Sequence, residues 1–136
     1  MKRAQRLRRA SDFRRTRELA GRGLAHPLLV LFTAPNDLGS LRVGITVSGR
    51  VGKAVVRNRA RRRLRAALRK HLDGVPPSGR DLVVVARPAI ATASWTAIDT
   101  AVGELLRRAG IRQPTRSPTS GATDAADATH VAPAYV

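Results

Sequence analysis

Residues 54–72 read AVVRNRARRRLRAALRKHL, a basic segment that decides the fold because it divides into two faces when it is wound as a helix. At about 100° per residue, one arc of this helix is apolar, as expected for a face that packs on a sheet. That arc holds Val56, Ala60, Leu64, Ala67, Leu68 and His71. The spacing therefore predicts a helix over residues 54–72 with one side turned to a core.

The other side of this predicted helix is basic. Asn58, Arg62, Arg65 and Arg69 share one stripe, flanked by Arg59, Arg63 and Lys70, with Arg57 and Arg61 nearer the apolar border. Eleven Lys and Arg residues and no acid lie between Leu38 and Leu72. A solvated helix usually mixes signs, because like charges one turn apart destabilise it by roughly 0.2 to 0.5 kcal/mol. The pattern thus favours a polyanion partner, and arginine forks suit phosphate.

Two strands are expected before the basic helix. Pro27–Thr33 (PLLVLFT) is apolar, and the next strand, Leu41–Val47, alternates apolar and polar residues with period two. The intervening Pro35–Ser40 (PNDLGS) has turn residues, so the two strands are expected to form a hairpin. Gly49–Lys53 (GRVGK) is a loop that leads into the basic helix.

After the basic helix, Asp81–Ala86 (DLVVVA) is an unbroken apolar run, typical of a central strand buried on both faces. Ser94 is placed to cap a last helix that Gly110 ends. The apolar stripe of this helix consists of Ile98, Ala101, Val102, Leu105, Leu106 and Ala109. These residues predict a helix that covers the same sheet.

A first helix, capped by Ser11 or Asp12, is expected to run to Ala20 and to stop at Gly21 and Gly23. The element order is then α-β-β-α-β-α. This order predicts the α+β class, a small sheet packed with helices.

Composition limits the class of function. The chain has 136 residues, 26 Lys and Arg against 9 acids, and a net charge of +17. Nucleic acid is the favoured polyanion, and because no apolar run reaches the length of a spanning helix, no membrane partner and a cytoplasmic location are expected. Residues 1–111 should form one RNA-binding domain, and residues 112–136, rich in Pro, Ser, Thr and Ala with no net charge, a disordered low-complexity tail.

Residues that would build a protein active site are sparse. Cysteine is absent, which excludes disulfides and thiolate metal sites, and the nine acids show no closely spaced pair outside the tail. The three histidines are scattered, and GRVGK lacks the glycine and the Ser or Thr of a phosphate-binding P-loop. We therefore expect no catalytic residues and no protein metal site.

One long stretch carries a family resemblance. LRVGITVSGRVGKAVVRNRARRRLRAAL, residues 41–68, closely resembles the signature region of the protein subunit of bacterial ribonuclease P, whose hallmark is an Arg-Asn-Arg motif. Here the motif is Arg57-Asn58-Arg59, with further basic residues at the family's offsets downstream and Lys53 just upstream. Fainter similarity extends from Arg6 to Arg108.

The resemblance implies a ribonuclease P protein-like fold, of the type called ribosomal protein S5 domain 2-like, with an unusual left-handed crossover through the basic helix. It implies a ribonucleoprotein, an endoribonuclease and hydrolase, that removes the 5′ leader from precursor tRNA. In that family a large RNA is the catalyst and holds most of the magnesium, and the protein is a non-catalytic subunit. The implied partners are this catalytic RNA and precursor tRNA, with no protein partner required.

The resemblance also assigns residues to two surfaces. The catalytic RNA would meet Lys53, Arg57, Asn58, Arg59, Arg62, Arg63, Arg65 and Arg69. The single-stranded leader would lie in a cleft between the sheet and the first helix, against Phe13 and Phe32, because unpaired bases stack on such rings. Arg17 stands where family members often carry another aromatic residue, so the cleft loses one ring.

Several alternatives remain open from the residues alone. Both phenylalanines could be core residues. The chain could be a ribosomal or general RNA-binding protein that makes the same phosphate contacts, or it could place the basic helix in the major groove of DNA. Binding to precursor tRNA that ignores leader length would favour the first function, and tighter binding to duplex DNA than to structured RNA would favour the second.

Overall fold

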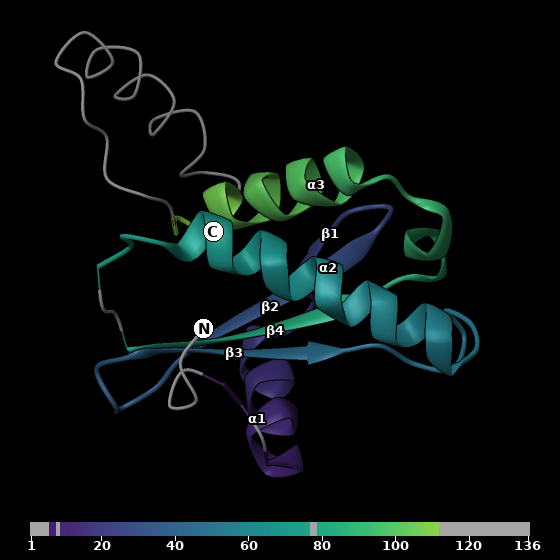
Figure 1. Cartoon of the computed structure of the whole chain (residues 1–136). Helices are drawn as coiled ribbons and strands as arrows, with labels where there is room; N and C mark the ends of the chain where they lie inside the picture. The colour runs from purple at the N-terminus through teal and green to yellow at the C-terminus, as the bar shows by residue number, and fades with distance from the viewer. Residues whose placement is uncertain (1–5, 8, 77–78, 112–136) are drawn as a thin grey trace, which may run out of the picture.

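The structure is a computed structural model that describes residues 6–7, 9–76 and 79–111 (Figure 1). The predicted tail, residues 112–136, lies outside the described residues. The elements in chain order are α1 (Ala10–Ala20), β1 (Leu24–Ala25), β2 (Leu29–Pro35), β3 (Leu41–Thr46), α2 (Ala54–Leu72), β4 (Arg80–Ala86), the 3-10 helix η2 (Pro88–Thr92) and α3 (Trp95–Arg108). The predicted α+β class is confirmed. None of the described helices is both long and apolar enough to cross a membrane.

The sheet has four strands in the order β1-β2-β4-β3, with β4 antiparallel to β2 and parallel to β3. The predicted hairpin of β2 and β3 is therefore wrong, because β4 lies between them. The turn at residues 36–40 reverses the chain, but both strands pair with β4 instead of with each other. β4 is the predicted central strand, and its residues 81–86 are buried except for the half-buried Val85.

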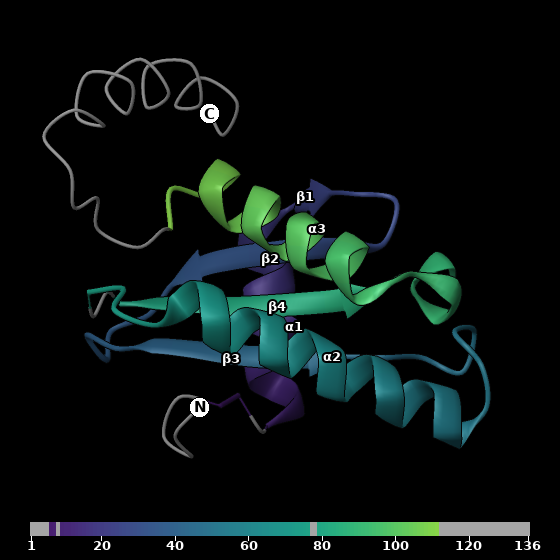
Figure 2. The same cartoon turned by 45° about the horizontal axis from the view of Figure 1, so that its top comes forward.

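The connection from β3 through α2 to β4 joins neighbouring parallel strands. In Figure 2 these two strands run to the right with β3 below β4, and α2 crosses in front of the sheet, which makes the crossover left-handed. Such connections are right-handed in about 98% of proteins. The left-handed crossover implied by the family resemblance is therefore present.

The two faces of the sheet are covered differently, with α2 and α3 on one side and α1 on the other (Figure 1). Alternate residues of β4 explain this division, because successive side chains point to opposite faces. Leu82 and Val84 enter the large apolar core shared with α2 and α3, whereas Val83 belongs to a small cluster on the α1 side.

The apolar arc of α2 packs as predicted. Ala60, Leu64, Ala67 and Leu68 are buried, Leu64 completely, and Val56 is packed against the same core. The helix bounds also match the prediction, with Lys53 as the N-cap residue. Val43 and Val47 complete this core from the β3 side, in agreement with the predicted period of two.

Of the predicted N-caps of the other two α-helices, one is confirmed and one is wrong. Ser94 caps α3 as expected, its side chain accepting a hydrogen bond from the Ala97 backbone N–H at 3.1 Å. The predicted cap of α1 is wrong, because the helix begins at Ala10 with Arg9 as its N-cap and no side-chain cap bond. Asp12 instead lies inside the first turn and faces Arg42.

Candidate nucleic-acid interface

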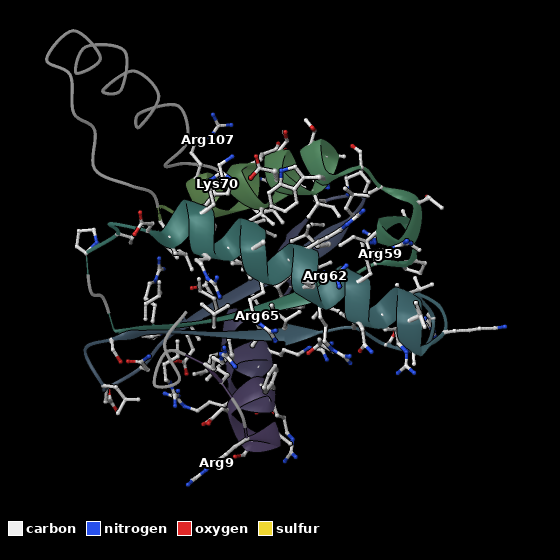
Figure 3. All side chains as sticks on the ribbon, viewed as in Figure 1. Arg9, Arg59, Arg62, Arg65, Lys70 and Arg107 are labelled. Atoms are coloured by element: carbon white, nitrogen blue, oxygen red, sulfur yellow. The ribbon has the colours of Figure 1, made fainter. Side chains whose placement is uncertain are left out.

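The basic face of α2 is directed away from the core. Figure 3 shows Arg59, Arg62 and Arg65 along this helix. Asn58, Arg59, Arg62 and Arg69 are exposed, as is Lys53 at the N-cap, while Arg57, Arg61, Arg63 and Arg65 are half-buried. Asn58, Arg62, Arg65 and Arg69 therefore share one face of the helix, whereas Arg57 lies at the border to the core, with its Nε buried. Contact of the predicted residues with RNA stays a prediction.

Two arginines of this face also hold α2 to the chain that precedes α3. Arg59 donates to the Ala91 carbonyl oxygen at 3.3 Å, and Arg63 donates to the Ala93 carbonyl oxygen at 3.0 Å. A guanidinium has five N–H donors, so one bond to a carbonyl leaves others to bind phosphate. These bonds fix the direction of two long side chains before any ligand arrives.

Asn58, the middle residue of the Arg-Asn-Arg motif, is exposed on this face. Its Oδ1 accepts a hydrogen bond from Arg61 Nη1 at 3.1 Å, three residues later. Asn58 therefore orients a neighbouring arginine and keeps its amide N–H groups available. The residue types alone did not predict this pairing.

A cleft of about 920 Å³ lies between α1 and the sheet. Its lining comprises Ala10, Phe13, Arg14, Arg17, Glu18, Gly21 and Arg22 from α1 and the residues after it, Phe32, Ile45, Thr46 and Val47 from the sheet side, and Arg61 from α2. Phe13, Phe32 and Arg17, which the family resemblance assigns to the leader, thus meet in one cavity. The four arginines and one acid make it electropositive.

The phenylalanine rings are both core and cleft residues. Phe32 is only 9% exposed and packs with Leu7 and Val83, while Phe13 is half-buried against the same cluster. The alternative that both belong to the core is therefore partly correct. Each ring is buried on one side and borders the cleft on the other.

Two glycines make room for these rings. A Cβ added at Gly44 would lie 2.5 Å from the Phe13 ring, and one at Gly23 would lie 2.9 Å from the Phe32 ring. Gly23 also has a φ of +76°, a conformation that other residues rarely adopt. The sequence prediction treated Gly23 only as a helix stop and gave Gly44 no role.

Arg17, which the family resemblance assigns to the leader, contacts an aromatic ring itself. Its guanidinium carbon lies 5.2 Å from the centroid of Phe32. A cation at this distance is attracted to the ring face by about 0.5 to 1 kcal/mol where it is exposed. At Arg17 the cleft therefore presents a guanidinium group, which can stack on a base or bind a phosphate.

A buried ion pair lies beside α1, and sequence reasoning missed it. Asp81, which has no exposed surface, accepts two hydrogen bonds from Arg42, from Nε at 2.9 Å and from Nη2 at 2.8 Å, and one from Asn36 Nδ2 at 2.6 Å. Burial opposes ionisation of Asp81, but the hydrogen bonds from Arg42 and Asn36 outweigh it and hold its pKa below the usual value. Asp81 is therefore an anion in the fold.

His71 also has an acidic neighbour that the sequence did not reveal. His71 Nε2 lies 2.9 Å from Asp99 Oδ1, and Lys70 Nζ lies 2.8 Å from Asp99 Oδ2. The hydrogen bond from Lys70 is the main reason that the pKa of Asp99 is lowered. Across the described part of the chain, no three His, Asp or Glu side chains come together in a way that could hold a metal ion.

Comparison with known proteins relates this chain to one protein family. The family model described as Ribonuclease P matches residues 1–110. The ribonuclease P protein component of Herpetosiphon aurantiacus is 43% identical over 118 residues, which cover 87% of this chain and 94% of that protein. The corresponding protein of Clostridioides difficile is 37% identical over 105 residues, or 77% of this chain and 91% of the other.

Solved structures show the same fold. The ribonuclease P protein of Staphylococcus aureus superposes with a TM-score of 0.71 at 26% identity, covering 80% of this chain and 98% of that one. The protein from Thermotoga maritima gives 0.63 at 29% identity, covering 75% of this chain and 96% of that one.

Proposed function

The chain belongs to the ribonuclease P protein family, and on this premise we propose that it serves the ribonucleoprotein through two adjoining surfaces with different ligands. It is a protein subunit of the particle that processes precursor tRNA. In our proposal the basic face of α2 docks on the catalytic RNA subunit, and the cleft beside α1 holds the single-stranded 5′ leader. Cleavage itself, a hydrolysis, would take place in the RNA.

The observation that carries this proposal is the contiguity of the two surfaces. Arg61 belongs to α2, yet its side chain lines the cleft with Phe13 and Phe32. A strand that left the cleft past Arg61 would come directly to the basic face of the same helix. The protein is therefore suited to bridge two pieces of RNA at the point where the leader meets the catalyst.

The chemistry of each surface fits its proposed ligand. Arginine forks on α2 bind phosphates bidentately and displace condensed cations, which gives affinity without sequence preference. The rings and guanidinium of the cleft accept unpaired bases, at roughly 1 to 3 kcal/mol per stacked base, again with little preference for which base. Such a protein would accept leaders of many sequences, as a processing enzyme for many tRNAs requires.

Magnesium belongs in this proposal to the RNA. Phosphate oxygens are the ligands that Mg²⁺ prefers, and the protein would act by neutralising neighbouring phosphates and fixing the substrate. The protein should therefore lower the magnesium concentration that the RNA needs for activity.

Reconstitution tests the proposal directly. The purified chain is added to a bacterial ribonuclease P RNA at low magnesium, and cleavage of precursor tRNA is compared with cleavage by the RNA alone. We expect a large gain in rate, which the combined replacement of Arg59, Arg62 and Arg65 by alanine should abolish. No gain from the unmodified protein would contradict the proposal.

A further inference from the structure

The position of α1 on the sheet is not explained by apolar packing alone. Among its eleven residues, Phe13 and Ala20 pack on a small apolar cluster and Thr16 is buried, while Leu19 is 58% exposed. By contrast, α2 and α3 share a core of many fully buried side chains. Something else must fix the distance and angle of α1, and with them the width of the cleft.

Asp81 is placed to do this. It lies in β4 opposite Ala34 and Arg42, on the α1 side of the sheet, with no exposed surface. Its two bonds from Arg42 form a bidentate pair, and the third bond, from Asn36, ties it to the turn between β2 and β3. Loss of Arg42 would leave the Asp81 carboxylate buried without its counter-ion, which is costly. The bidentate hydrogen bonds therefore hold Asp81 and Arg42 in one geometry.

The same pair reaches α1 at two residues. Arg42 Nη1 lies 3.7 Å from Asp12 Oδ2, and Arg15 Nη1 lies 3.9 Å from Asp81 Oδ2. Arg15 also donates to the Pro35 carbonyl oxygen at 3.4 Å, at the end of β2. Acidic and basic side chains of α1, β3 and β4 thus alternate in one chain of contacts, in the order Asp12, Arg42, Asp81 and Arg15.

This contact lies on the side of α1 away from the cleft. On α1, Phe13, Arg14 and Arg17 line the cleft, whereas Asp12 and Arg15 face the ion pair. On β3, Arg42 and the cleft residue Thr46 are four residues apart, which is about 13 Å along a strand. Asp81 therefore cannot touch a ligand in the cleft, and any effect on that ligand must pass through the placement of α1.

We propose that Asp81, with Arg42, is a positioning residue for leader binding that holds α1 at the distance from the sheet at which the cleft fits an unpaired strand. This rests on the proposed function, because it takes the leader as the occupant of the cleft. When the pair is broken, α1 keeps its apolar contacts but loses its register over the sheet. A displacement of α1 of the order of 1 Å is enough to remove a large part of the affinity that the leader gains in the cleft.

The test is a ratio of affinities measured on the reconstituted ribonucleoprotein. Dissociation constants are determined for precursor tRNA with its leader and for the same tRNA without a leader, and their ratio gives the contribution of the leader. Loss of folded protein would also remove the leader contribution, because the RNA alone has no cleft. Binding of each variant to the RNA subunit is therefore measured first, and the ratio is determined at protein concentrations that saturate the RNA, so that it reports positioning and not stability. The substitutions are Asp81→Asn and the milder Asp12→Asn, at a partly exposed residue.

Two further variants make the result interpretable. Asp99→Asn removes another acid that pairs with two basic side chains, but at the contact of α2 with α3, so it is the matched control. Phe13→Ala changes the cleft wall itself and reports whether the leader lies there.

We expect Asp81→Asn to lower the leader ratio by roughly tenfold, Asp12→Asn by less, and Asp99→Asn not at all. If Phe13→Ala lowers the ratio but neither Asp81→Asn nor Asp12→Asn does, the positioning role is wrong and the proposed function stands. If Phe13→Ala has no effect, the cleft does not hold the leader and both proposals fail. Should Asp81→Asn not fold, Asp12→Asn alone decides between these outcomes.

Discussion

The two faces of the sheet are built by different means. On the α2 and α3 side, a large apolar core with fully buried leucines fixes the helices, and none of the described charged residues on this side is fully buried. On the α1 side, the apolar cluster is small, a charged pair is buried, and a cleft remains open. The α2 and α3 side thus provides most of the apolar stabilisation of the fold, whereas the α1 side is less fully packed and has a cavity that can hold a ligand.

The largest expected effect is on the stability that the apolar face provides. Leu64→Ala, at a residue with no exposed surface, should lower the free energy of unfolding by about 2 to 5 kcal/mol. Phe13→Ala should cost less, because Phe13 is only half-buried. Urea unfolding of both variants measures this. An equal or larger loss for Phe13→Ala would show that the α1 face carries as much stability as the other.

A second comparison uses one glycine from each face. Gly44→Ala would bring a methyl group 2.5 Å from the Phe13 ring, whereas Gly103→Ala would meet the His71 ring at 2.7 Å. Both should destabilise the fold by about 1 to 3 kcal/mol through overpacking. Only Gly44→Ala should also reduce the affinity gained from a leader, in an equilibrium binding assay. A similar reduction from Gly103→Ala would mean that the cleft responds to strain anywhere in the fold.

The basic face of α2 is tested by salt. Arg62→Ala should reduce the slope of log K against log salt, for binding to the RNA subunit, by about one unit if Arg62 neutralises one phosphate. Arg9, an exposed arginine at the start of α1, serves as the matched control, and Arg9→Ala should leave the slope unchanged (Figure 3). An unchanged slope for Arg62→Ala would show that Arg62 does not neutralise a phosphate and is an ordinary solvated residue.

The smallest effect concerns acid. The pKa of Asp81 is lowered in the fold, so its ionisation stabilises the protein above the unfolded carboxyl pKa, near 3.9, and this contribution is lost as pH falls through the lower folded value. The free energy of unfolding of Asp81→Asn should therefore fall less steeply than that of the unmodified protein below about pH 4. Parallel acid-unfolding curves would contradict the ionised state of Asp81.

Local patterns predicted much of this molecule from its sequence. The bounds of α2, the cap at Ser94 and the central strand at residues 81–86 follow from helical periodicity, a side-chain hydrogen bond and an apolar run. These depend on neighbours in the chain. The two short elements, β1 and η2, have too few residues to show a period and were missed.

Apart from the cap of α1, the errors involve partners far apart in the chain. The turn before Leu41 indicates a reversal but cannot show that β4 inserts between the two strands. Arg42 and Asp81 look like the polar residues of two strands, and only their parallel pairing brings them together. Phe13, Phe32 and Arg17, which the family resemblance grouped, line one cleft, and their contact with the leader stays a prediction. The space that Gly44 and Gly23 leave for the two rings was visible only in the structure.

The central claim is that the basic face of α2 and the cleft beside α1 bind two different pieces of RNA. The leader ratio of the reconstituted particle tests this claim most directly. We predict that Phe13→Ala lowers the ratio by about fivefold or more, the equivalent of at least one stacked base, without changing affinity for the RNA subunit. Arg62→Ala should weaken binding to the RNA subunit and leave the ratio unchanged. A fall in the ratio with Arg62→Ala as large as with Phe13→Ala would contradict the separation of the two surfaces.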